Sequence, residues 1–288
     1  MEWINVIIQG VLLGGMFALF ATGLSLIFGV MRLVNLAHGD LIICGSFIAI
    51  AIIEVFAVHP LFTLIAVIPL MFAFGYILQK KLLNFTLGND ILPPLLVTFG
   101  LSIIIQNVLL EMFTADTRRL QAGGLETASL DIGGDMAIGW FSLLTFVVAV
   151  GVIWGLQWMF YHTALGRVFR ATSDDQTTVQ LMGVDNKKIF ALAMGIALAI
   201  CGVAGVLMAI RTNVSPEIGP GRLLFAFEAV IIGGLGNLWG TLLGGVILGI
   251  AQSVGAQIHP GFQILAGHLA FLLVLIIRPN GLMPKISG

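Results

Sequence analysis

The sequence predicts an all-α, polytopic integral membrane protein that forms a single domain over residues 1–288. Only 27 of its 288 residues are charged (13 Lys and Arg, 14 Asp and Glu), or 9%, against roughly 25% in an ordinary soluble domain. The hydrophobic fraction is 59% and the mean hydropathy is +1.08. So few charges cannot cover a soluble globule, which excludes a soluble enzyme and a disordered chain. The net charge of −1 also offers no basic field for nucleic acid.

Stretches free of charged residues mark the membrane spans, because a helix needs about 20 apolar residues to cross a bilayer. Six of them are expected at Trp3–Met31, between Asp40 and His59, at Leu61–Gln79, at Ile91–Leu110, within Met136–Gly166 and at Ile189–Ile210. The next stretch, Ala229–Ile277, runs for 49 residues without a charge, which is too long for one helix. Gly255–Gly261, with His259 and Pro260, is expected to divide it, so the last span is about Phe262–Ile277 and the total is about eight.

The distribution of Lys and Arg predicts the orientation, because these residues are enriched in cytoplasmic loops. An outside N-terminus places nine basic residues inside: Arg32, Lys80, Lys81, Arg167, Arg170, Lys187, Lys188, Arg278 and Lys285. It leaves four outside, namely Arg118, Arg119, Arg211 and Arg222. Eight simple passes would return the C-terminus to the outside, whereas Arg278 and Lys285 favour the inside.

Two interpretations of residues 224–256 follow from this parity problem. In one, the segment crosses twice through a broken or re-entrant helix at the glycine-rich run from Gly233 to Gly240. In the other, it is a straight packing helix and the C-terminus lies outside. Glu228, near the start of this segment, could be the acid of a relay or binding site. The favoured interpretation is an interfacial carboxylate at a helix end.

Motifs for catalysis are missing from the sequence. It has no G-x-x-x-x-G-K-[ST] and no G-x-S-x-G, and its five histidines lack the i,i+4 spacing of a metal site. Cys44 and Cys201 lie in apolar runs and are expected to be buried thiols. We therefore expect no catalytic residue, no metal and no cofactor.

Glycines four residues apart recur and predict close helix packing. They are Gly10 with Gly14, Gly151 with Gly155, Gly236 with Gly240 and Gly244, and Gly245 with Gly249. A second interpretation is that the face from Gly236 to Gly244 lines a path or a subunit seam.

Three connecting segments are distinctive. Residues 114–135 form a long outer loop, and residues 161–188 form a long inner loop with helical character and four basic residues. The connector Gly29–Asp40 places Asn35, His38 and Asp40 at a membrane border within an otherwise apolar run. It is either a folded-in connector with a polar tip or an ordinary interfacial turn.

Three motifs in order resemble the permease subunits of branched-chain amino acid ABC importers of the LivH type. The first is GVMRLVNLAHG at 29–39, and the second is GRVFRA at 166–171 with Asp175 and LMGV at 181–184. The third runs from Phe227-Glu228-Ala229 to Gly249, with RPNGL at 278–282. Length and order agree over essentially the whole chain. At Val179 the family pattern usually has a small Ala.

The resemblance implies a subunit of the bacterial inner membrane that forms a transmembrane path for the substrate and does not itself hydrolyse ATP. The expected partners are a homologous second permease in a heterodimer, two cytoplasmic ATP-binding subunits, a periplasmic substrate-binding protein and the lipid bilayer, without nucleic acid. Residues 161–188 would be the cytoplasmic coupling loop and 114–135 a periplasmic loop. The coupling residues would be Gly166, Arg167, Arg170, Ala171, Asp175, Gly183 and Val184. Arg167 and Arg170 would position this loop, and Gly183 would end its helix.

The substrate path is expected beside the glycine-rich run and the polar connector, because a polar solute needs hydrogen-bond partners outside water. Its predicted residues are Asn35, His38, Gly39, Gly233, Gly234, Gly236, Asn237 and Gly240. Related importers carry urea, short amides or aromatic acids, which remain alternative substrates. A stand-alone channel or secondary carrier is a further alternative, disfavoured by the long basic loop and by the lack of acids in the spans.

Overall fold

The computed structural model describes residues 2–88, 90, 92–133 and 136–283. Among these residues, eight helices are long and apolar enough to cross a membrane. The expectations for Gly134, Asp135 and Lys285 fall outside the described residues. The α-helices are α1 (Glu2–Met31), α2 (His38–Phe56), α3 (Leu64–Lys81), α4 (Leu92–Phe113), α5 (Trp140–His162), α6 (Ala164–Asp174), α7 (Gln176–Leu181), α8 (Asn186–Arg211), α9 (Gly219–Gly233), α10 (Leu238–Ile258) and α11 (Gln263–Ile277).

Short 3₁₀ turns and one hairpin complete the secondary structure. The 3₁₀ turns are η1 (Pro60–Thr63), η2 (Leu83–Phe85), η3 (Gly123–Leu125), η4 (Pro216–Ile218) and η5 (Pro260–Phe262). Strands β1 (Ser129–Gly133) and β2 (Met136–Gly139) pair antiparallel. Strand β1 lies in the predicted loop 114–135, and β2 occupies the start of the stretch Met136–Gly166 that was expected to contain the fifth span. The all-α class is confirmed, with this hairpin as a local addition.

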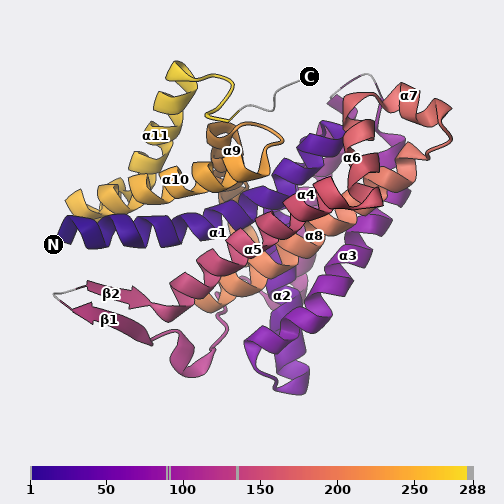
Figure 1. Ribbon diagram of the computed structural model, residues 1–288. Helices are drawn as coiled ribbons and strands as arrows, with labels where there is room; N and C mark the ends of the chain where they lie inside the picture. Colours follow the sequence, from indigo (N-terminus) through magenta and orange to yellow (C-terminus); the bar gives the residue numbers. More distant parts are fainter. Residues whose placement is uncertain (1, 89, 91, 134–135, 284–288) are drawn as a thin grey trace.

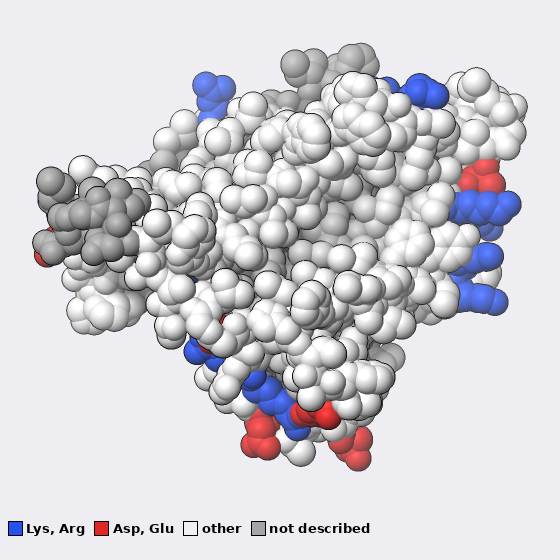
Figure 2. Space-filling model, turned by 60° about the horizontal axis from the view of Figure 1, so that its bottom comes forward, with Lys and Arg blue, Asp and Glu red and all other residues white. Residues whose placement is uncertain are grey.

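Helices α1 and α8 form the centre of the bundle. Most of their residues are buried, including the run Met16–Ile27 of α1. Helix α10 lies along α1, and the hairpin and the α6–α7 pair lie at opposite ends of the molecule (Figure 1). Apolar side chains on the outer helices are exposed, as in a protein whose surround is lipid. Figure 2 shows one face on which the charges lie around the rim and the broad middle has none.

Glycines allow the close approach of α1 and α10. A Cβ added to Gly10 would lie 2.6 Å from the Cα of Ile250, and one added to Gly245 would lie 2.7 Å from the carbonyl oxygen of Gly14. Such distances are well inside van der Waals contact, so side chains do not fit at this seam. Packing by these glycine pairs is confirmed. Gly151 and Gly155, in contrast, have no described neighbour within 4 Å of an added Cβ.

Hydrogen bonds between distant segments define the two ends of the bundle. At the first end, Arg118 and Val214 exchange backbone hydrogen bonds of 2.8 Å, and Gln9 donates to the carbonyl of Ala137 at 2.8 Å. At the second end, the Asn84 amide donates to the carbonyl of Lys187 at 3.1 Å. Arg118 thus lies at the opposite end from Lys187, as the orientation rule requires. Which end faces the cytoplasm stays a prediction.

The last three long helices alternate in direction. Helix α9 ends near the last turn of α1, because Gly236, just beyond it, lies against Gly29. Helix α10 returns along α1, and α11 runs back so that the chain after Arg278 reaches the end of α9. Glu2 and Arg278 therefore lie at opposite ends. Residues 224–256 form the end of α9, a turn and most of α10, and their re-entrant route through a bilayer stays a prediction.

Candidate substrate path and coupling helices

The connector after α1 folds back into the bundle. Arg32 has a left-handed φ of 51° and reverses the chain, and α2 begins at His38, whose imidazole Nε2 donates to the carbonyl of Phe20 at 2.8 Å. Phe20 precedes Met31, the end of α1, by eleven residues, a distance of about 16 Å along a helix. Asn35 and His38 are fully buried, which confirms the folded-in connector.

A polar cluster lies immediately beyond this connector. Both carboxylate oxygens of Asp40 accept hydrogen bonds from α4: Oδ2 from the Ser102 hydroxyl at 2.5 Å and Oδ1 from the Gln106 amide at 2.9 Å. Asp40 is 1% exposed and lies in the first turn of α2. Its carboxylate also contacts Gly219, the first residue of α9. Because helix N-termini carry partial positive charge, two helices favour this anion.

The sequence reasoning noted Asp40 but missed Ser102 and Gln106. Their spacing of four residues places both on one face of α4. A polar pair on one face of an otherwise apolar span was the available signal.

The glycine run separates α9 from α10. Gly234 and Gly236 have φ angles of 109° and 78°, which glycine alone adopts readily. Asn237 caps α10, since its Oδ1 accepts from the backbone N–H of Gly240 at 3.0 Å. Gly233 and Gly240 face each other so closely that a Cβ on either would overlap the backbone of the other.

The C-terminal tail closes the end of α9. The N–H groups of Leu282 and Met283 donate to the carbonyls of Ile232 and Gly233 at 2.9 and 3.0 Å, and the Asn237 amide donates to the carbonyl of Met283 at 2.9 Å. The final carbonyls of a helix lack partners within it, so the tail supplies them here. Asn237 thereby joins α10, the glycine turn and the tail.

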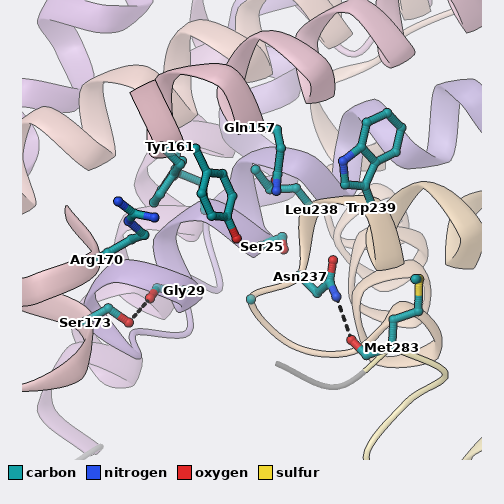
Figure 3. A pocket seen from close by; sticks show the side chains of 13 residues that line it. Ser25, Gly29, Gln157, Tyr161, Arg170, Ser173, Asn237, Leu238, Trp239 and Met283 are labelled. Carbon is teal, nitrogen blue, oxygen red and sulfur yellow. Dashed lines mark hydrogen bonds between the residues drawn. The ribbon is translucent and has the colours of Figure 1, made fainter. Parts of the chain in front are cut away.

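A cavity of about 440 Å³ lies between this turn, α1, α5 and α6 (Figure 3). Gly236 and Asn237 line it together with Ser25, Gln157 and Arg170. The guanidinium of Arg170 lies over the ring of Tyr161 at 4.7 Å, and the Ser173 hydroxyl donates to the carbonyl of Gly29 at 2.5 Å. Helix α6 is thus joined directly to the cavity wall.

The predicted path residues divide into separate places. Gly236 and Asn237 lie at the cavity, whereas Gly233, Gly234 and Gly240 are buried in the contacts of α9 with α10 and the tail. The connector residues Asn35, His38 and Gly39 are buried elsewhere, with Gly39 against the backbone of Gly219 and Leu223. The structure does not bring these three residues to this cavity; of the connector, Gly29 lines it.

The interpretation of Glu228 as an interfacial carboxylate at a helix end is wrong. Glu228 lies in the interior of α9, is 2% exposed and pairs with His268 of α11. The charge-free neighbours on both sides left its place in the helix undetermined, and its partner is 40 residues away.

Helices α6 and α7 replace the predicted inner loop, which confirms its helical character. Thr163 caps α6 by accepting from the N–H of Gly166 at 3.1 Å. Gly166 itself is buried against the backbone of Phe160. A Cβ added to Gly166 would lie 2.5 Å from the Cα of Phe160. Arg167 and Ala171 are exposed. The close approach at Gly166 fixes how α6 leaves α5.

The α7 tip has defined ends. Asp175 caps its start, since Oδ1 accepts from the N–H groups of Thr177 and Thr178 at 2.9 and 3.1 Å. Gly183 has a φ of 85°. Its backbone N–H donates to the carbonyl of Gln180 at 2.9 Å, and the backbone N–H of Val184 donates to the carbonyl of Val179 at 3.3 Å. This is the Schellman motif. The prediction that Gly183 ends the helix is confirmed.

The α7 tip carries apolar side chains in the open. Leu181 and Met182 are 85% and 79% exposed, next to the left-handed turn at Gly183. Hydrogen bonds from the side chain of Thr178, and from the backbone of Thr178 and Thr177, hold the pKa of Asp175 below its ordinary value. The cap is therefore present above the ordinary carboxyl pKa and is lost only as the pH falls through the lowered one.

Within the described residues, no group of three or more His, Cys, Asp or Glu side chains could hold a metal ion. The polar groups around the cavity are hydroxyl, amide and guanidinium groups, which can bind and orient a solute.

Apolar spanning helices enclose a cavity with both polar and apolar lining beside the glycine turn, and a helix pair lies at one end; these features are typical of a membrane permease. The sequence pattern of the family "Branched-chain amino acid transport system / permease component" matches residues 6–278, and the chain belongs to this family.

Curated relatives agree along the whole chain. The permease protein BraD of the high-affinity branched-chain amino acid transport system of Pseudomonas aeruginosa is 30% identical, over 99% of this chain and 96% of BraD. LivH of Escherichia coli K12, a permease protein of the same kind of system, is 26% identical over 96% of this chain and 94% of its own. Among solved structures, the fold is similar to a chain of PsaBC from Streptococcus pneumoniae in complex with Fab. The superposition covers 97% of this chain and 96% of that chain, with a TM-score of 0.49 and 16% sequence identity.

Proposed function

We propose that this chain is a permease subunit of an ABC importer in a bacterial inner membrane and that it carries branched-chain amino acids by alternating access. Family membership over residues 6–278 supports this proposal most strongly. ATP hydrolysis resides on two cytoplasmic partner subunits, and a periplasmic binding protein delivers the substrate. A homologous second permease completes the path.

The α6–α7 pair is the proposed contact with an ATPase subunit. Its apolar side chains Leu181 and Met182 are exposed. Burial of this apolar surface against a partner subunit would stabilise the complex. Movement of the pair would be transmitted to the cavity wall by two contacts. Arg170 lies over the Tyr161 ring, and the Ser173 hydroxyl is hydrogen-bonded to the carbonyl of Gly29. Closure of the ATPases would thus move α6 against α1 and the glycine turn, a switch between packed arrangements.

The substrate class is tested by uptake into proteoliposomes that contain the chain with its partner subunits. Radiolabelled leucine, isoleucine and valine should accumulate in an ATP-dependent way, and urea, acetamide and phenylalanine should not. ATP-dependent uptake of one of the latter solutes alone would instead assign the chain to another substrate of the wider group. Uptake without any ATPase partner would favour a stand-alone carrier.

The coupling role predicts a selective loss of stimulation. Asp175→Ala removes the cap of α7, and Gly183→Val places a β-branched residue in a left-handed turn, so each variant should disorder the tip. ATP hydrolysis stimulated by the loaded binding protein should fall severalfold, while basal hydrolysis and complex yield stay normal. Asp174→Ala, a neighbouring exposed acid that caps no helix, is the control. Normal stimulation in both variants would remove the coupling role.

The path interpretation predicts that Gly236→Val abolishes uptake in a complex that still assembles. The added side chain narrows the space beside Gly29 and the cavity. Because valine is also strained at a positive φ, by about 1–2 kcal/mol, Gly123→Val is the matched control: its φ is 67° and nothing lies within 4 Å of an added Cβ. Loss of the whole complex in Gly236→Val, with no assembled but inactive form, would favour a packing role.

A further inference from the structure

A second cavity lies at the other end of the bundle, where α8 ends and α9 begins. Its volume is about 280 Å³, close to the lower limit for small-molecule sites. Arg211, the last residue of α8, Arg222, in the first turn of α9, and Gln252 of α10 line it. No Asp or Glu is among its lining residues.

Three of its polar side chains present donors that lack acceptors. Arg211 Nη1, Arg222 Nε and Gln252 Nε2 are buried and have no hydrogen-bond partner among the described residues. Neither arginine belongs to an ion pair within that part of the chain, and Gln252 is only 3% exposed. A buried donor without a partner is costly, and most so when it is charged. Three such donors around one cavity fit an anionic oxygen ligand.

Apart from Thr212 and Gln263, the remaining lining residues are apolar. Phe17 and Phe225 pack with ring centroids 5.2 Å apart, and Leu13, Met16 and Met208 continue the lining. Glu228 is not among the lining residues; it pairs with His268, whose ring stacks on Phe225 with centroids 6.2 Å apart. The cavity therefore combines positive donors with aliphatic and aromatic surface.

We propose that Arg211, Arg222 and Gln252 form a binding site for an anionic oxygen group and that its occupant is the carboxylate of a transported amino acid, whose aliphatic side chain packs on the apolar walls. Planar guanidinium groups bind carboxylates through paired, charge-assisted hydrogen bonds. This inference rests on the proposed function for the substrate class. The phosphate of a phospholipid headgroup presents the same chemistry and is the alternative source.

The cavity adjoins the polar connector through one residue. Phe20 lines the cavity, and its carbonyl accepts the hydrogen bond from His38. Gly39 and Asp40 in turn contact Gly219, three residues before Arg222. A ligand here would therefore lie one residue away from the connector, which the sequence analysis placed beside the substrate path.

The test uses the full complex in nanodiscs of phosphatidylcholine, without the binding protein, and measures binding of radiolabelled leucine by equilibrium dialysis. Leucinamide, which lacks the carboxylate, should compete roughly tenfold or more weakly than leucine. Arg211→Gln and Arg222→Gln should each weaken leucine binding roughly tenfold or more. Arg118→Gln, which also removes a positive charge from this end, should bind as the wild type does.

The lipid source is tested by adding phosphatidylglycerol to the nanodiscs and identifying retained lipid by native mass spectrometry. Retention by the wild type and not by the two arginine variants, with leucine binding unchanged, would overturn the carboxylate assignment. Equal binding of leucine and leucinamide, or no binding to the wild type, would overturn it too. Failure of the proposed function would appear separately, as a wild-type complex that imports no branched-chain amino acid.

Discussion

Valine in place of Gly14 should leave no assembled transporter in the membrane. Helix α1 is the central helix of the bundle, and at Gly14 it meets α10 backbone to backbone. An added Cβ would lie 2.7 Å from the carbonyl oxygen of Gly245 and 2.8 Å from the backbone nitrogen of Val246. Neither atom belongs to a flexible side chain, so the helices themselves must separate.

Separation would also strip the neighbouring contacts at Gly10, Gly245 and Gly249. Overpacking in a core costs typically 1–3 kcal/mol, and a clash with backbone at a close helix crossing should reach about 3 kcal/mol or more. The yield of intact complex on size-exclusion chromatography should fall to near zero. Gly100→Val, at a glycine of α4 with nothing within 4 Å of an added Cβ, is the matched control. A normal yield of the Gly14 variant would show that the seam can open.

The membrane spans follow from composition because lipid imposes a simple rule on long apolar helices. The predicted spans Trp3–Met31 and Ile189–Ile210 correspond to α1 and α8 within a few residues. Local chemistry also explains the end of α7, since a glycine in the left-handed region ends a helix wherever it lies. The expectation at Gly183 needed no knowledge of the fold.

Contacts between distant segments could not be predicted in this way. Ser102 is 62 residues from Asp40, and apolar spans do not say which of their faces will meet. The docking of Met283 on Gly233 depends on the direction of α11, which the charge count left open. Asn35 and His38 were polar enough for a path, yet both are buried inside the bundle, where Oδ1 of Asn35 accepts from the N–H of Ala37 at 3.0 Å and His38 bonds to the carbonyl of Phe20.

The contacts of Asp40 predict the second large effect: Asp40→Ala should unfold this part of the bundle. The variant removes two hydrogen bonds to a charged group. It leaves the buried Ser102 hydroxyl without its acceptor, and the Gln106 amide keeps only its bond of 3.2 Å to that hydroxyl. Hydrogen bonds to charged groups contribute about 1.5–3 kcal/mol each, so a loss of about 3 kcal/mol or more is expected. Asp40→Asn keeps the shape and one acceptor oxygen, and loses mainly the charge that the N-termini of α2 and α9 favour, at about 0.3–1 kcal/mol for each helix.

Thermal denaturation of the purified complex should therefore rank the wild type above Asp40→Asn, with Asp40→Ala far below. A double-mutant cycle with Ser102→Ala isolates the bond between the two side chains, because residues in direct contact are coupled and distant ones are not. Thr145→Ala, a buried hydroxyl that bonds only within α5 to the carbonyl of Phe141 at 2.9 Å, should add its effect independently. If Asp40→Ala unfolded at the same temperature as the wild type, the other contacts of α9 would be enough to hold it in place, and Asp40 would be free to serve the transport path.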